Sequence, residues 1–128
     1  MNLIEEYESL ADAGKWKDAL PIIKKIVETN SAIDTSWFNY GVCLDALGQH
    51  SEAADAFIKA HELNTSDYGI HYRVFRSLFQ ANDLDRSYEF CIYLCETFAE
   101  ARQTLFDSDE YQELLKYKPF KELKVQYA

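Results

Sequence analysis

The chain has 128 residues, of which 48% are apolar and 27% charged, so it can fold as one globular domain and is not a disordered chain. Four glycines and two prolines are too few for the many tight turns of a β-sandwich or barrel, and they favour long helices. The formal net charge of −9 excludes a nucleic acid or an anionic membrane as a favourable partner, because phosphates repel such a surface.

Nothing in the sequence indicates export or membrane insertion. The segment 1–6 lacks the basic region and apolar core of a secretory signal, and no stretch approaches the roughly 20 apolar residues that span a bilayer. The three cysteines are an odd number, which in a chain without a signal favours free thiols in a reducing compartment. We therefore expect a cytoplasmic protein.

The chain repeats itself with a period of 34 residues, which predicts a solenoid of stacked units. We divide it into units 1–33, 34–67 and 68–100, followed by a C-terminal segment, 101–128. A shift by one period superimposes Leu10 on Leu44, Gly14 on Gly48, Ala19 on Ala53, Asn30 on Asn64, and Leu44 on Leu78.

The first unit, 1–33, keeps apolar positions for two helices and a glycine between them. It differs from the second unit in having Tyr7 where that unit has a small residue. We expect a helix–turn–helix unit. The residues that fit the repeat are Leu10, Gly14, Trp16, Ala19 and Ile23.

The second unit, 34–67, carries the pattern most clearly. Trp37, Tyr40 and Leu44 fall at i, i+3 and i+7, which predicts one apolar stripe of a first helix. Gly48 lies where this helix must end, and it suits a left-handed terminal residue. The pattern of the unit is Trp37, Tyr40, Gly41, Leu44, Gly48, Ala53, Phe57 and Ala60, with small residues at 41, 53 and 60 that let two helices approach closely.

This order and spacing resemble the tetratricopeptide repeat family, and the chain is similar to small bacterial members of it. The resemblance implies an all-α fold: a right-handed α–α superhelix of three helix–turn–helix repeats with C-terminal capping helices. The whole chain, 1–128, would form a single domain.

The third unit, 68–100, departs from the pattern at several positions. Phe75 replaces the small residue of the first helix, Asn82 takes the position of the glycine, and Cys91 takes the aromatic position of the second helix. His71 takes the position of the tryptophan. We expect His71 and Cys91 to be packed side chains.

The last segment, 101–128, is predicted to cap the solenoid, since the end of a solenoid needs an element with a polar outer face. Ser108 followed by Asp109 and Glu110 indicates a helix start with acidic residues in its first turn. Pro119 suits the start of another short helix.

The sequence contains no pattern typical of catalysis or metal binding. Cys91 and Cys95 share a helix face, but a tetrahedral zinc site needs four ligands, or three and a water, and no histidine has the spacing to complete the set. Glycine-rich phosphate loops and the common hydrolase motifs are absent. We predict a protein that is not an enzyme and that uses no metal or cofactor.

In the tetratricopeptide family the first helices line a concave groove that holds an extended peptide or a helix. The resemblance therefore implies an adaptor or scaffold that binds a peptide or helix of another protein. Aromatic residues with a few charges are the composition of an interface hot spot. The implied groove residues are Phe38, Asn39, Val42, Asp45, Tyr72, Arg73, Arg76 and Phe79, of which Phe38, Tyr72 and Phe79 are surplus to the packing pattern.

Some family members bind the C-terminal carboxylate of heat-shock chaperones. Asn39 and Arg73 match that pattern, but its other positions hold Ile4, Glu8 and Gly69, and Glu8 would repel a carboxylate. We therefore do not predict this clamp.

Three alternatives remain open. The C-terminal segment would cover the groove if it folded back, and an acidic chain would also suit an immunity-type inhibitor of a basic protein. The chain would form a homodimer or larger assembly if the aromatic third unit stacked on a second copy. The residues for such stacking are Phe79, Tyr88, Phe90, Tyr93 and Phe98.

Overall fold

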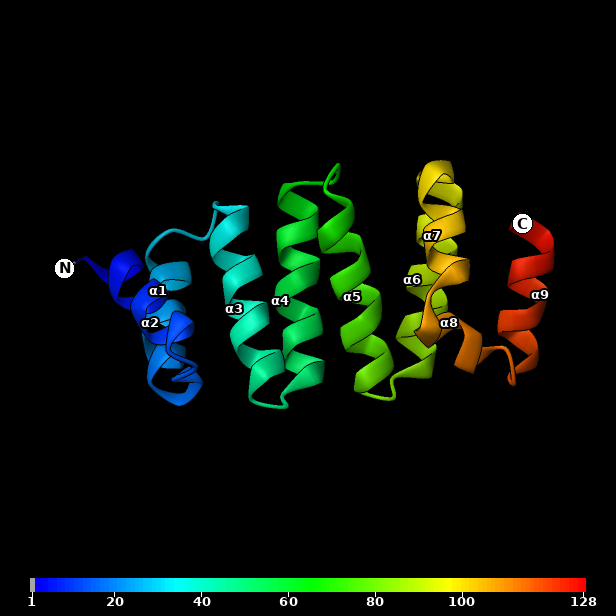
Figure 1. The fold of residues 1–128 in the computed structure, drawn as a ribbon. Coiled ribbons are helices and arrows are strands. Elements are labelled where there is room, and N and C mark those ends of the chain that lie inside the picture. The colour runs from blue at the N-terminus through cyan, green and yellow to red at the C-terminus, as the bar shows by residue number, and fades with distance from the viewer. Residues whose placement is uncertain (1) are drawn as a thin grey trace.

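The computed structural model describes residues 2–128, and within this range it contains helices and no strands. The helices stand side by side in chain order, from the N-terminus at one end of the molecule to the C-terminus at the other (Figure 1). They are α1 (Leu3–Asp12), α2 (Trp16–Thr29), α3 (Asp34–Ala46), α4 (His50–Leu63), α5 (Tyr68–Gln80), α6 (Leu84–Thr97), the 3-10 helix η1 (Ala99–Ala101), α7 (Arg102–Asp107), α8 (Asp109–Leu114) and α9 (Lys118–Tyr127). In the described range no helix is long and apolar enough to cross a membrane.

The turns between paired helices repeat at the predicted period. Gly14, Gly48 and Asn82 follow α1, α3 and α5, and their φ angles are 70°, 78° and 55°. The next residue in each turn donates its N–H to a leucine carbonyl of the preceding helix, at 2.8, 2.9 and 3.0 Å. This is the Schellman arrangement, which satisfies carbonyls at a helix end. Asparagine is the side chain that best tolerates the left-handed conformation after glycine, so Asn82 can take the glycine position.

A second hydrogen bond also repeats with the period. The indole Nε1 of Trp37 donates to the carbonyl oxygen of Ser31 at 2.9 Å, and Nε2 of His71 donates to that of Thr65 at 3.0 Å. In both cases a ring near the start of a first helix satisfies a carbonyl in the connection before it. His71 therefore replaces tryptophan in its hydrogen bond as well as its position, and it is 2% exposed.

The centre of the solenoid is packed through small residues. A Cβ atom at Gly41 would lie 2.7–2.8 Å from three ring atoms of Phe57, so only glycine permits this approach of α3 to α4. Phe57 itself is completely buried. The face of α4 that surrounds it is made of alanines, which are Ala53, Ala54, Ala56 and Ala60.

The C-terminal segment belongs to the core of the third helix pair. Tyr111 of α8 is fully buried, and its hydroxyl donates to the carbonyl oxygen of Phe120 in α9 at 2.7 Å. Its ring lies 6.2 Å from that of Phe75 in α5. Ser108 caps α8 by accepting from the N–H of Tyr111 at 3.2 Å, as the sequence predicts, and Pro119 lies in the first turn of α9. The helices after α6 therefore complete the solenoid.

The aromatic residues of the third unit are largely used by this core. Phe79, Tyr88, Phe90 and Phe98 are partly buried against the C-terminal cluster, whereas Tyr93 remains 40% exposed. Stacking of these rings on a second copy stays a prediction, and the four partly buried rings have less surface to offer to it than Tyr93. The repeat boundaries at 33, 67 and 100 within a single domain stay a prediction.

Candidate partner-binding surfaces

The residues predicted to line the groove lie on two first helices, α3 and α5, which contact each other directly. The Ser77 hydroxyl of α5 donates to Asp45 Oδ2 of α3 at 2.8 Å. The other oxygen of Asp45 lies 2.8 Å from His50 Nδ1. Both carboxylate oxygens of Asp45 are therefore bonded within the protein, and the residue links α3 to α4 and α5.

Phe38 and Arg73 form a stack with the core. The ring of Phe38 lies 5.4 Å from that of Phe57, and the guanidinium carbon of Arg73 lies 5.9 Å from the centroid of each ring. Phe38 is therefore packed and not surplus, contrary to the sequence analysis. Arg73 makes no ion pair with any residue that the structure describes. Its charge is held over an aromatic surface by a cation–π contact.

Asn39 and Val42 are half-buried beside this stack. The hydroxyl of Tyr7 donates to the backbone oxygen of Asn39 at 3.0 Å and ties α1 to α3. Burial raises the pKa of Tyr7 to about 12, so this hydroxyl keeps its proton. The side-chain amide of Asn39 makes no hydrogen bond within residues 2–128, and it therefore remains able to bind a peptide group.

The C-terminal part of the predicted groove is covered in part by the helices after α6. The hydroxyl of Tyr72 lies 3.0 Å from both carboxylate oxygens of Glu110 in α8. Arg76 Nε lies 3.9 Å from one of these oxygens. Phe79 packs against the C-terminal cluster and is not surplus either. Burial and, after it, Glu110 raise the pKa of Tyr72, so its hydroxyl stays a proton donor.

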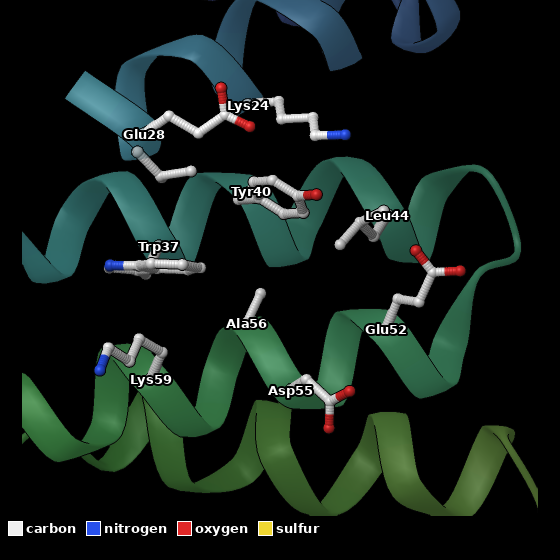
Figure 2. A pocket seen from close by; sticks show the side chains of 10 residues that line it. Lys24, Glu28, Trp37, Tyr40, Leu44, Glu52, Asp55, Ala56 and Lys59 are labelled. Atoms are coloured by element: carbon white, nitrogen blue, oxygen red, sulfur yellow. The ribbon is translucent and has the colours of Figure 1, made fainter. Parts of the chain in front are cut away.

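A hollow of about 380 Å³ lies between α2 and α4, with α3 as its floor (Figure 2). Trp37, Tyr40, Leu44 and Ala56 supply its apolar surface. Burial raises the pKa of Tyr40, and Glu52 and Glu28 raise it further. The charged rim consists of Lys24, Glu28, Glu52, Asp55 and Lys59. Sequence reasoning missed this hollow because the stripe of Trp37, Tyr40 and Leu44 is that of a packed helix face, and the space left beside it depends on how far apart α2 and α4 stand.

The histidines and cysteines lie in packed surroundings. His61 and His71 form an edge-to-face pair with ring centroids 4.5 Å apart, and the Nδ1 atom of each has no partner in the described range. Burial, and to a smaller extent His71, lowers the pKa of His61 to about 4. Burial raises the pKa of the Cys91 thiol, and Cys43 and Cys95 are also buried and free. Within residues 2–128 no three His, Cys, Asp or Glu side chains gather as a metal site would require.

The fold is found in solved structures of low sequence identity. The type III secretion chaperone SycD of Yersinia enterocolitica, in complex with a peptide of the translocator YopD, matches with a TM-score of 0.65 and 16% identity over 98% of this chain and 92% of that one. PcrH in complex with the chaperone binding region of PopD matches with 0.63 and 14% over 98% of this chain and 82% of that one. A SycD structure described as an alternative dimer matches with 0.63 and 16%, over 97% and 90%.

These similarities confirm the predicted fold class, an all-α superhelix of three helix–turn–helix repeats with C-terminal capping helices. No protein-family model and no curated protein matches the sequence. At 14–16% identity the likeness carries the fold alone.

Proposed function

We propose that this chain is a cytoplasmic protein of the tetratricopeptide type that binds a peptide or helix of a partner protein on the face of α1, α3 and α5. The observation that carries the proposal is the shared fold with SycD and PcrH, each solved with a segment of another protein bound. The three free cysteines agree with a reducing compartment.

The chemistry of α3 and α5 supports this proposal. Arg73 presents a charge without an ion pair over the rings of Phe38 and Phe57, and Asn39, which follows Phe38 in α3, presents a side-chain amide without a hydrogen bond in the described range. A bound segment would bury apolar side chains there, while the guanidinium and the amide would pair with its carbonyl or carboxylate groups. Tyr72, which is 38% exposed, extends the same surface along α5.

The experiment that tests the proposal compares two doubly substituted proteins with the wild type. The groove variant carries Arg73→Glu and Asn39→Ala. The control variant carries Lys25→Glu and Gln126→Ala, the same reversal of a positive charge and loss of an amide at two exposed positions. Phe38 is left unchanged, because its ring packs on Phe57 and its loss would disturb the fold.

Each protein serves as bait for affinity capture from an extract of the cells that make it, with mass spectrometry as the readout and circular dichroism to confirm equal folding. A partner retained by the wild type and the control, and lost by the groove variant, is the expected result. The affinity is then measured with the purified partner. Equal recovery of all partners by the groove variant contradicts the proposal.

A further inference from the structure

The polar atoms of one stripe of α5 are paired with carboxylates from the chain after α6. Tyr68, Tyr72 and Arg76 are spaced by four residues and therefore lie on one face of the helix. The hydroxyl of Tyr68 donates to Glu100 at 2.7 Å, and Tyr72 and Arg76 both contact Glu110. Arg73 lies on the neighbouring stripe, towards α3, and has no carboxylate partner in the described range.

The corner formed by Tyr72 and Arg76 is a binding site for a carboxylate, to which both side chains offer hydrogen-bond donors. The hydroxyl donor lies 3.0 Å from both oxygens of Glu110, and the guanidinium adds a charge at 3.9 Å. The Glu110 side chain is 15% exposed, whereas that of Arg76 is 43% exposed. The guanidinium therefore keeps donors free toward solvent after Glu110 is bound, since it has five of them.

We propose that this corner binds an acidic side chain of the partner segment, and that Glu110 is its intramolecular competitor. This inference rests on the proposed function and names the chemistry of the partner. Arg73 and Arg76 create a local positive surface in a chain of net charge −9, and both lie on the helix predicted to line the groove. A carboxylate is the group that the corner already holds, so an aspartate or glutamate of a partner meets the same donors.

The contacts of Glu110 suit a competitor that can be displaced. Its ion pair with Arg76 is long, at 3.9 Å, and the Arg76 side of the pair is 43% exposed, so the pair contributes little to stability. Only the Glu110 side chain has to rotate, because α8 is held independently by the buried Tyr111. When Glu110 occupies the corner, the partner cannot bind there, so the apparent affinity equals the intrinsic affinity multiplied by the fraction of time the corner is free. For contacts this weak we expect the affinity to fall by roughly fivefold.

The test uses the full chain and selected peptides as probes. Short random peptides displayed on phage are selected on the wild-type protein, and those that no longer bind an Arg73→Glu variant are synthesised. Each aspartate or glutamate in them is replaced in turn by asparagine or glutamine. Affinities are measured by fluorescence anisotropy on the wild type, on Glu110→Ala, and on Glu113→Ala, which changes an exposed glutamate of the same helix.

We expect one acidic position in the peptides whose neutralisation weakens binding to the wild type. The parent peptide should bind Glu110→Ala about fivefold more tightly than the wild type, and Glu113→Ala equally tightly. The neutralised peptide should gain nothing from Glu110→Ala. Substitution of Arg76 by Gln should remove the difference between parent and neutralised peptides. Glu110→Gln, which keeps the length of the side chain, should shift the affinity in the same direction as Glu110→Ala.

Two results would overturn the inference. If peptides sensitive to Arg73→Glu bind the wild type and Glu110→Ala equally, or tolerate neutralisation of every acidic residue, then the groove binds segments but Glu110 does not compete. If no selected peptide is sensitive to Arg73→Glu, then the proposed function fails and this inference fails with it.

Discussion

The second and third helix pairs solve the same packing problem in opposite ways. In the second pair the first helix supplies the small residue, Gly41, and the second helix supplies the large ring of Phe57. One period later the first helix supplies Phe75 and the second supplies the small Cys91, and both are fully buried. In each pair one large and one small side chain together fill the space between the two helices, and the sequence determines which helix carries the large one.

This exchange of size has a consequence beyond the pair. Phe57 is enclosed by α3, α4 and their neighbours, and the alanines of α4 let those helices approach closely. Phe75 instead lies in a cluster that includes Tyr111, Phe106 and Phe120 from the C-terminal helices. The second pair is thus completed by the helices next to it in the solenoid, and the third pair by the cap.

The largest effect is expected from removing the ring that joins the third pair to the cap. Phe75→Ala should lower the free energy of unfolding by about 4 kcal/mol, because it leaves a cavity among the cap aromatics. Adding Cys91→Phe restores the arrangement of the second pair and should recover about 2 kcal/mol. Denaturant unfolding of the single and double variants measures both. A double variant less stable than Phe75→Ala would show that the two positions do not share one volume.

A smaller effect is expected from His61, which packs against His71, the residue that replaces Trp37 in the third pair. His61 has a folded pKa lowered to about 4, below the 6.5 of the unfolded chain. The unfolded state therefore binds the proton more tightly. Stability should be complete above pH 6.5 and fall as the pH drops to about 4, by roughly 3 kcal/mol. The midpoint of urea unfolding against pH measures this loss. The His61→Phe variant should reduce the slope in this window, while His71, whose pKa burial also lowers, keeps the remainder. An unchanged slope would contradict the assignment.

The smallest effect is expected at the close approach of the second pair. Gly41→Ala gains about 1 kcal/mol of helix propensity, but its Cβ would overlap the Phe57 ring, so the net loss of stability should be about 2 kcal/mol. Phe57→Leu makes room for the added methyl group, so Gly41→Ala in a Phe57→Leu background should cost much less than in the wild type. Thermal unfolding of the four proteins gives the coupling. Additive effects would mean that Phe57 does not set the spacing of α3 and α4.

The sequence predicts the parts of the molecule that repeat. The turn residues Gly14, Gly48 and Asn82, the exchange of small and large residues, and the burial of His71 and Cys91 all follow from the period, since each unit meets a similar neighbour. The start of α8 at Ser108 follows from local capping chemistry. Such features depend on contacts that are close along the chain or one period apart.

The contacts of the candidate site do not follow from the period. Glu110 meets Tyr72 and Arg76 because short helices after the last repeat turn back on α5, and no earlier unit provides a template for that packing. The register of α3 predicts Phe38 in the groove, yet its ring packs on Phe57, which Gly41 allows to approach α3 closely. The C-terminal segment contacts Tyr72, Arg76 and Phe79 but leaves Tyr72 38% exposed. The use of the groove residues by a partner therefore stays a prediction.

The placement of the three thiols makes the protein its own reporter of local opening. Cys91 and Cys95 lie in the cluster that α8 and α9 complete, whereas Cys43 lies in the cluster of the first helix pair. All three are fully shielded from solvent. A thiol-specific reagent can reach each one only when its own cluster opens, so the rate of labelling records that event separately at the two ends of the solenoid. Detachment of the cap would be measured by the labelling rate of Cys91 and Cys95, and fraying of the N-terminal helices by that of Cys43.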